Sequence, residues 1–250
     1  DEALLADVVM HTDPGAALWR RFGADMAAIH AGLPSAHPAQ CDGRGTPPML
    51  RDAISQNFRQ VRPWLRAAAD IEQLDRLEEQ AWRGWHAHEA LLWQRYGQGL
   101  VRECHGDLHL GNIVLLDGRA RAFDAIEFNP ALSWIDVISE MAFLVMDCES
   151  RERGAQGMTA LNAWLDHSGD HAGLTLLDFL CAYRAMVRAK VSALSAGRPP
   201  FAQGSEAERG CRRYLELAER YAQPRVPFLA ITCGVSGSGK STLAEALAGQ

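Results

Sequence analysis

The sequence predicts an α+β chain that is mainly helical and that ends with the start of a separate α/β domain. Three observations predict this. Apolar residues recur with a helical period through most of the first hundred residues. The period changes to that of short strands between residues 99 and 123, and helices resume afterwards. Near the end, a short apolar run leads into the glycine-rich stretch GVSGSGKS, residues 234–241.

The first hundred residues are expected to form amphipathic helices. Asp13-Pro14 predicts a helix start, because Asp caps helix N-termini and Pro suits the first helical position. Residues 31–48 are rich in Gly and Pro and predict a loop. Two further helices are expected at about 50–65 and 70–96, since apolar side chains recur there on one face.

Short strands are expected next, at 99–104, 112–116 and 119–123. Asp117-Gly118 is a strong signal for a two-residue hairpin between the last two of them. Helices are then expected at 133–147, 151–167, 173–196 and 205–222. After a linker at 222–227, the apolar run FLAITC predicts a buried strand at 228–233.

Composition restricts the class of protein. A chain of 250 residues with 48% hydrophobic and 22% charged residues can build a core. The net charge of −6, with no block of like charges, argues against a nucleic-acid partner. The sequence has neither an apolar run of about 18 residues nor the basic start of a signal peptide, so no membrane association is expected. Its six cysteines include no C-x-x-C pair, which predicts reduced thiols in a cytoplasmic protein.

The stretch HGDLHLGN, residues 105–112, carries the first candidate site. Asp107 and Asn112 lie in one loop, and the hairpin that follows brings Asp124 to the end of its second strand. Phosphoryl transfer needs a carboxylate near the attacking hydroxyl and oxygen ligands for magnesium. Mg²⁺ prefers oxygen ligands, so an Asn carbonyl and an Asp carboxylate suit it. The spacing H-x-D-x-x-x-x-N followed by a hairpin and an Asp is typical of the catalytic loop of kinases.

Two other interpretations compete with this one. His105 and His109 are four residues apart and would form a zinc pair if the stretch were helical, and HAHE (86–89) would add ligands. Gly106 and Gly111 argue against a helix, and no cysteine is suitably spaced. The stretch could also be a structural hairpin with incidental polar residues.

Residues 105–124 resemble the aminoglycoside phosphotransferase family, the small-molecule branch of the kinase-like fold. The resemblance implies that Asp107 is the catalytic base and that Asn112 and Asp124 are ligands of Mg²⁺. It also implies that His105 supports the loop by packing and hydrogen bonding. His109 would lie near the substrate, and Glu127 would assist the metal or the substrate. ATP would be the phosphate donor and a small molecule the acceptor, whose identity the sequence does not determine.

The second candidate site matches the P-loop pattern G-x-x-x-x-G-K-[ST]. Its backbone N–H groups and the start of the following helix would bind phosphates, with Lys240 reaching the β and γ phosphates and Ser241 holding Mg²⁺. The residues expected to bind ATP here are Gly234, Ser236, Gly237, Ser238, Gly239, Lys240, Ser241 and Thr242.

The resemblance implies two domains. Residues 1–222 would be the larger, C-terminal lobe of a protein-kinase-like phosphotransferase fold. Residues 223–250 would be the first strand, P-loop and helix of a P-loop NTPase domain, as in a bacterial subgroup in which the two are fused. Residues 1–104 contain no lysine and no five-stranded pattern, so the N-terminal lobe is missing and we expect a fragment truncated at both ends.

The expected function is transfer of the γ-phosphate of Mg-ATP to a hydroxyl of a small molecule. The alternative is a regulatory, pseudokinase-like module attached to a catalytic P-loop kinase or ATPase. The presence of Asp107, Asn112 and Asp124 together speaks against the alternative, because a degenerate kinase usually loses at least one of them. No protein partner can be inferred.

Overall fold

A computed structural model describes residues 3–36, 43–223 and 231–248. The strands are β1 Ala3–Leu4, β2 Val101–Glu103, β3 Ile113–Leu116, β4 Arg119–Ala122 and β5 Trp134–Asp136. The α-helices are α1 Leu5–His11, α2 Ala16–Gly32, α3 Pro47–Val61, α4 Ala68–Gly97, α5 Pro130–Ser133, α6 Val137–Ser150, α7 Gly154–Ser168, α8 Leu177–Ser195, α9 Glu206–Ala222 and α10 Lys240–Ala248. The short 3₁₀ helices are η1 Arg62–Trp64, η2 Leu110–Asn112 and η3 His171–Leu176.

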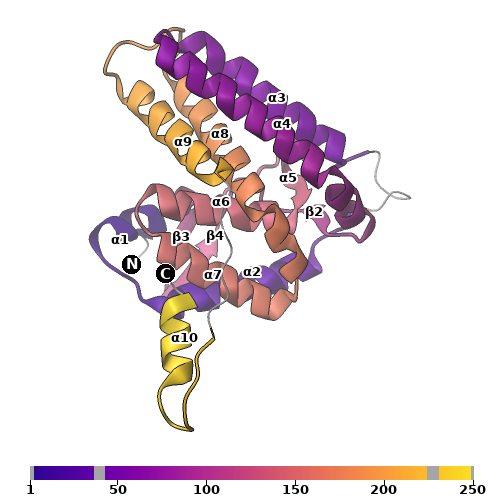
Figure 1. Cartoon of the computed structure of the whole chain (residues 1–250), viewed down its shortest axis with the longest axis vertical. Coiled ribbons are helices and arrows are strands. Elements are labelled where there is room, and N and C mark those ends of the chain that lie inside the picture. Colours follow the sequence, from indigo (N-terminus) through magenta and orange to yellow (C-terminus); the bar gives the residue numbers. More distant parts are fainter. Residues whose placement is uncertain (1–2, 37–42, 224–230, 249–250) are drawn as a thin grey trace.

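The helices form two groups that share α6. In Figure 1, α3 and α4 lie along α8 and α9 in the upper group, while α2 and α7 pack together in the lower group, beside β3 and β4. Helix α6 lies between them, and its side chains are buried on every face from Val137 to Cys148. A helix that is buried on every face belongs to the core, and this one connects both groups.

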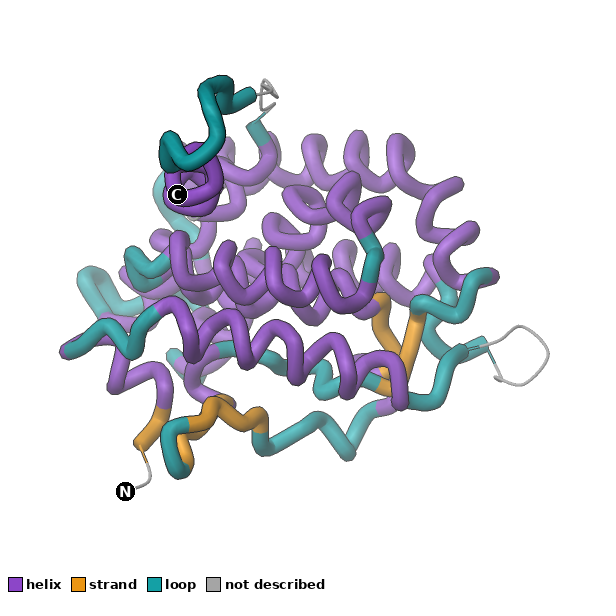
Figure 2. The backbone as a smooth tube through the Cα atoms, turned by 90° about the horizontal axis from the view of Figure 1, so that it is seen from below, coloured by secondary structure: helices purple, strands orange, loops and turns teal. Residues whose placement is uncertain are grey.

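The strands make two small antiparallel sheets. One has the order β1-β3-β4 and the other pairs β2 with β5. Figure 2 shows them as two separate orange groups, the first beside the N-terminus. The predicted hairpin is confirmed: Asp117 and Gly118 both have positive φ, 50° and 71°, as a two-residue turn with the right twist requires.

Two predicted boundaries were wrong. Helix α2 begins at Ala16, because the Asp13 carboxylate accepts a hydrogen bond from the Gly15 N–H and closes a turn before the helix. The helix predicted from residue 133 begins at Val137, where the Asp136 side chain accepts from the Ile138 N–H, and residues 134–136 form a strand instead. Pairing with β2 across the fold decides that strand, and the local pattern contains no sign of it.

The predicted strand at 228–233 is not formed in its described part. Residues 228–230 lie outside the described residues, and Ile231–Cys233 has no strand partner within the described part of the chain. Ile231 is 75% exposed, contrary to the burial that its apolar run predicts. A parallel strand needs neighbours to pair with, which explains the exposed, unpaired segment. The helix expected after the glycine-rich loop is present as α10.

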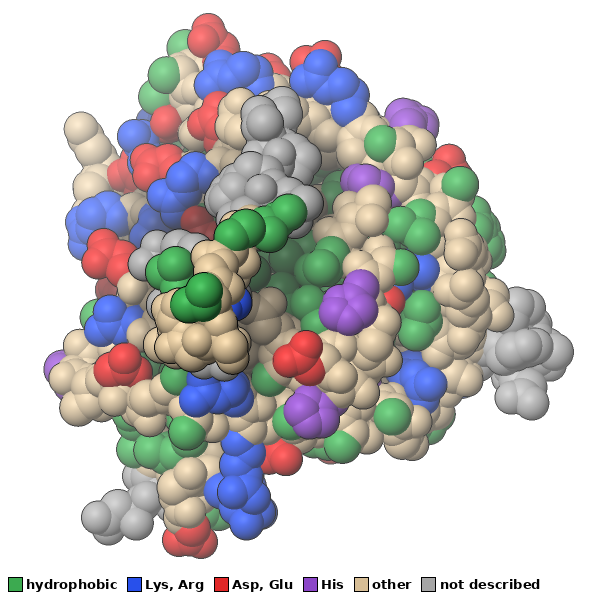
Figure 3. Space-filling view, turned by 60° about the horizontal axis from the view of Figure 1, so that its bottom comes forward, with side chains coloured by type: hydrophobic (Ala, Val, Ile, Leu, Met, Phe, Trp, Pro, Cys, Tyr) green, Lys and Arg blue, Asp and Glu red, His purple; other side chains and the backbone are tan. Residues whose placement is uncertain are grey.

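No helix in the described part is both long enough and apolar enough to cross a membrane. Basic and acidic side chains are interspersed over the face seen in Figure 3 and form no large patch of one sign there.

Candidate active site

The loop 105–112 connects β2 to β3 and is shaped by Gly106. This residue has φ +86°, and a Cβ there would lie 2.7 Å from the Leu132 carbonyl oxygen. A side chain would therefore be strained twice, by its backbone conformation and by contact with α5. The end of the loop is fixed by a hydrogen bond of 3.0 Å from the Phe123 N–H to the Asn112 carbonyl, which joins it to the end of β4.

His105 connects the loop to the segment after β4. Its Nε2 lies 2.7 Å from the Phe123 carbonyl oxygen, and its Nδ1 accepts from the Asp107 N–H at 3.3 Å. An acceptor Nδ1 and a carbonyl facing Nε2 assign the neutral ring with its proton on Nε2. Both ring nitrogens are occupied, so the zinc interpretation of this histidine does not fit the geometry.

Asp107 is held by its neighbours on the same loop. The Asn112 side-chain N–H₂ donates to the Asp107 carboxylate and to its carbonyl, each at 3.0 Å. His109 Nε2 lies 3.4 Å from the same carboxylate, while its Nδ1 accepts from the Gly111 N–H. The carboxylate side chain is 35% exposed, so it remains open to a ligand while its direction is fixed.

The charges around Asp107 keep it ionised. Burial acts to raise the pKa of Asp107, whereas its hydrogen-bond contact with His109 acts to lower it. The positive charges of Arg188 and Arg184 lower it further, and the net pKa lies below the ordinary value of 3.8. Asp107 is therefore a carboxylate at neutral pH and can accept a proton.

Asp124 and Glu127 share a cleft with Asp107. The cleft has a volume of about 650 Å³, and all three acidic residues line it. Asp124 has φ +62° and is exposed, so the backbone turn after β4 presents its carboxylate to the opening. Of the predicted site residues, Asp107, Asp124 and Glu127 thus meet at one cleft, whereas His105, His109 and Asn112 belong to the adjoining loop and are not among its lining residues.

The donor set fits a divalent cation. The side-chain nitrogen of Asn112 donates its hydrogen bonds to Asp107. The side-chain oxygen, Oδ1, is an acceptor of the kind that can bind a metal ion. Together with the Asp124 carboxylate this gives hard oxygen ligands, which Mg²⁺ prefers. A second group, His30, Cys104 and Glu140, has ligand atoms within 4.8 Å of one another. His30 already uses both nitrogens in hydrogen bonds, so this cluster is a hydrogen-bond network.

Two buried carboxylates of α6 hold the backbone of the loop. Glu140 accepts from the Gly106 N–H at 2.7 Å and from the His105 N–H at 3.3 Å. Asp147, two turns later, accepts from the Leu110 N–H at 2.9 Å. Both residues are almost fully buried, at 1% and 0% exposure. These two residues were not predicted from the sequence, although an acid inside the apolar run VISEMAFLVMDC needs a buried partner and is a signal for such a role.

Glu140 is itself fixed by a buried relay. His30 Nε2 lies 2.9 Å from the Glu140 carboxylate, and the Trp164 indole N–H donates to His30 Nδ1 at 3.0 Å. Burial raises the pKa of Glu140, but the contact with His30 and the Gly106 N–H more than offset it, so the net pKa is lowered. The relay runs from Trp164 on α7 through His30 on α2 to Glu140 on α6. The sequence did not predict these contacts, because the three residues are far apart along the chain.

Helix α8 adds positive charge to the cleft. Arg184 is 4% exposed and donates to the Gly106 and Ser139 carbonyl oxygens, each at 3.2 Å. Its remaining nitrogen, Nη2, has no partner among the described residues. Lys190 lines the same cleft, and burial together with Arg184 lowers its pKa. No carboxylate in the described part of the chain lies within ion-pair distance of Lys190.

A comparison with models of protein families shows which family the chain belongs to. The model described as "Phosphotransferase enzyme family" matches residues 3–177, which is most of the chain and contains the whole cleft loop. The chain belongs to this family. The expected resemblance is confirmed at this level, and the kinase-like fold with it.

The chain has uncharacterised mycobacterial relatives. Proteins of Mycobacterium tuberculosis and Mycobacterium bovis are each 34% identical to it over 195 residues, which are 77% of this chain and 38% of the relative. The chain therefore spans well under half the length of these relatives.

Solved structures of a glucosamine kinase share the fold. One crystal form has a TM-score of 0.52 at 14% identity and covers 86% of this chain and 51% of that one. The same kinase in complex with glucosamine, ADP and inorganic phosphate gives a TM-score of 0.50 at 15% identity, with 82% and 50% covered. At such identities the likeness shows the fold alone.

The glycine-rich stretch lies outside the family match. Residues 234–239 are exposed, and Figure 1 shows α10 and its loop projecting from the remainder of the chain. Lys240 Nζ donates to the Val235 carbonyl oxygen at 2.6 Å, so the lysine folds back over its own loop. None of its described hydrogen bonds reaches the residues of the cleft, and the two predicted sites are separate.

Proposed function

We propose that this chain is the catalytic lobe of an ATP-dependent kinase that phosphorylates a hydroxyl of a small molecule. The observation that carries the proposal is the arrangement of Asp107, Asn112 and Asp124. A hydrogen bond of 3.0 Å joins the first two, and the first and third line one cleft. Phosphoryl transfer depends mainly on positioning and charge stabilisation, which this arrangement supplies.

Asp107 acts on the acceptor hydroxyl. Its lowered pKa keeps it ionised, and Asn112 and His109 fix its direction. The hydroxyl donates a hydrogen bond to this carboxylate and loses its proton to it as the new O–P bond forms. The bond between the β,γ-bridging oxygen and the γ-phosphorus breaks at the same time, and ADP leaves with the electron pair.

Asn112 Oδ1 and the Asp124 carboxylate hold Mg²⁺ in this proposal. The metal supplies neutralisation of the charge on the phosphate oxygens when it is bound. Within the chain, His105 keeps the two ligand segments together, because it bonds to the Phe123 carbonyl next to Asp124 and to the backbone of the catalytic loop. Glu127 lines the cleft and would contact the acceptor or the metal.

The acceptor is a small polar molecule with hydroxyl groups. The cleft carries Asp107, Asp124 and Glu127 opposite Arg184 and Lys190, so it is not the strongly acidic surface that a polycationic acceptor requires. The two cations of α8 suit the transferred phosphoryl group or an anionic group of the acceptor. The solved complex of glucosamine kinase makes glucosamine the first amino sugar to assay.

A second function is proposed for the glycine-rich loop. Its pattern and the helix that follows support a P-loop that binds nucleotide phosphates at the start of α10, with residues 223–250 as the beginning of a separate nucleotide-binding domain. In the alternative arrangement this domain performs the chemistry and the cleft regulates it.

Transfer from radiolabelled ATP to a panel of sugars, amino sugars and other alcohols tests the proposal. We expect Mg²⁺-dependent labelling of at least one compound, and a decrease of about 10²–10⁴-fold in kcat for Asp107→Asn with nucleotide affinity retained. The matched control is Asp117→Asn in the hairpin turn, which should transfer at the original rate. Unchanged transfer by Asp107→Asn would refute the assignment, and transfer lost only in Lys240→Ala would favour the regulatory alternative.

A further inference from the structure

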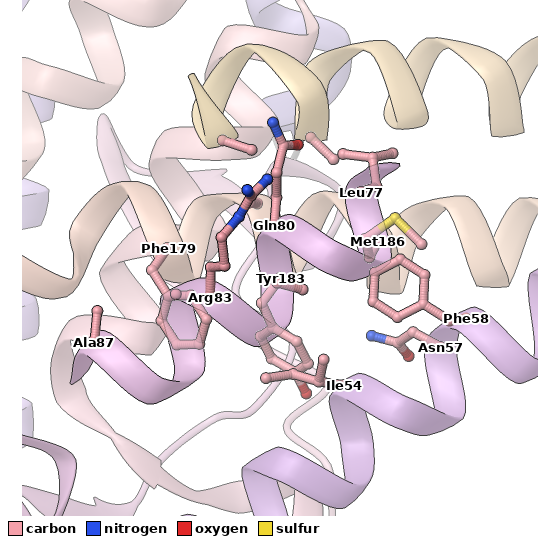
Figure 4. Close-up of a pocket in the computed structure, with 15 residues that line it drawn as sticks. Ile54, Asn57, Phe58, Leu77, Gln80, Arg83, Ala87, Phe179, Tyr183 and Met186 are labelled. Carbon is pink, nitrogen blue, oxygen red and sulfur yellow. The ribbon is translucent and has the colours of Figure 1, made fainter. Parts of the chain in front are cut away.

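The helices of the upper group enclose a pocket that the cleft does not include. Its volume is about 520 Å³, and α3, α4, α8 and α9 all contribute to its walls. Figure 4 shows aromatic and aliphatic side chains converging on it from these helices. The apolar part of the lining includes Ile54, Phe58, Leu77, Phe179 and Met186. Pockets of this size and lining are typical of small-molecule sites.

Polar atoms without partners lie at the wall of this pocket. Asn57 is 1% exposed, and neither its amide oxygen nor its amide nitrogen has a hydrogen-bond partner among the described residues. Figure 4 shows the amide among Ile54, Phe58 and Tyr183. Gln80 Oε1 is buried and unpartnered at the same pocket. Such groups are unfavourable in a folded protein unless something pairs with them.

Packing does not explain Asn57. It lies on the buried face of α3 between apolar positions, where leucine has the same branching and would leave no unpaired amide. Water is a poor partner here, because the largely apolar lining offers it few further hydrogen bonds. A ligand group that both donates and accepts would satisfy both ends of the amide at once.

The pocket is distinct from the cleft that holds Asp107. Tyr183 on α8 contributes to both walls, but none of the acidic residues of the cleft lines the pocket. The charged residue of the lining is Arg83, whose side chain is 66% exposed. A neutral polar group therefore suits the interior better than a carboxylate does.

We propose that this pocket binds a small, flat, mainly apolar molecule that carries a neutral donor–acceptor group such as a carboxamide. Asn57 pairs with that group, and the aromatic and aliphatic side chains of α3, α4 and α8 enclose the apolar body. This site does not depend on the phosphotransfer assigned to the cleft, and its ligand does not compete with nucleotide.

Calorimetric titration with naphthalene-2-carboxamide tests the site, with 2-methylnaphthalene as the probe that lacks the polar group. The wild-type protein is expected to bind the carboxamide in a saturable way, and Asn57→Leu to bind it at least about tenfold more weakly because two hydrogen bonds are lost. The affinity for 2-methylnaphthalene should change less than threefold. Mg·ATP should leave carboxamide binding unchanged.

Two further variants keep the outcome interpretable. Gln56→Leu makes the same kind of change on the exposed side of α3 and should bind both probes like the wild type. Ala182→Phe fills the pocket from α8 and should abolish binding of both while a cooperative thermal transition is retained. Without ligand, Asn57→Leu should melt at a higher temperature than the wild type, because the unpaired amide is gone. No saturable binding to the wild type, or equal carboxamide affinity in Asn57→Leu, would overturn the proposal.

Discussion

The carboxylate of Glu140 accepts a hydrogen bond of 2.7 Å from the backbone N–H of Gly106, the residue before Asp107. This contact places a buried charge of α6 directly under the proposed catalytic loop. The positive φ of Gly106 sets the direction of its N–H group. The hydrogen bond to Glu140 holds this backbone conformation in place. The geometry of Asp107 therefore depends on a buried residue that does not itself line the cleft.

Glu140→Gln is expected to impair positioning rather than chemistry. The amide can accept only one of the two backbone N–H bonds well, so kcat should fall about 10–100-fold with a small change in the acceptor KM. Steady-state kinetics well below the melting temperature will measure this. Glu216→Gln, an exposed change on α9, is the control and should retain full kcat. An acceptor KM that rises by the same factor as kcat falls would contradict a positioning role.

Glu140 also makes stability depend on pH. Its pKa is lowered in the folded state from the ordinary 4.5, so the unfolded chain takes up this proton first as pH falls. The stability that the carboxylate contributes is complete above about pH 4.5 and is lost as pH falls through the lower folded pKa. Denaturant unfolding between pH 6 and 3 should show a smaller loss in the free energy of unfolding for Glu140→Gln than for the wild type. If this free energy depended on pH identically in both proteins, another titrating group would be responsible for the loss.

Arg95 joins three segments through a buried ion-pair network. Its guanidinium donates to Asp136 at 2.7 and 2.8 Å and to Asp170 at 2.6 and 2.7 Å, and Arg95 is 1% exposed. Arg95→Met leaves two buried carboxylates without their cation and should reduce the free energy of unfolding by about 3–5 kcal/mol. Arg76→Met on the same helix, whose ion pair with Glu219 is exposed, should change it by less than about 1 kcal/mol. Equal losses would show that the network contributes no more than a surface pair.

Nucleotide binding distinguishes the two predicted sites. Asp124→Ala should weaken Mg·ATP binding in the cleft, because it removes an oxygen ligand and a charge beside the phosphates. Lys240→Ala should leave that binding unchanged, since Lys240 contacts its own loop at Val235 and no described residue of the cleft. Isothermal titration of both variants beside the wild type measures this. Binding lost only with Lys240→Ala would assign the nucleotide to the glycine-rich loop instead.

The candidate cleft could be located from sequence because its residues follow from local rules. Asp107, Asn112 and Asp124 are fixed by a loop and a two-residue hairpin, and the Asp117-Gly118 turn that brings them together is a local signal. The same holds for the long amphipathic helices, whose period depends on neighbours three and four residues away. Strand β5 and the start of α2 were missed because pairing with β2 and a side-chain turn at Asp13 decided them.

By itself, the sequence determined the helical class, the hairpin and the residues that gather at the cleft, because these depend on neighbours along the chain. Only the tertiary structure decided what supports them. The relay from Trp164 through His30 to Glu140 spans residues from α2, α6 and α7, and its hydrogen bonds exist only after those helices pack. The unpaired amide of Asn57 is likewise a property of the space between packed helices, since exposure to water would satisfy it in the unfolded chain.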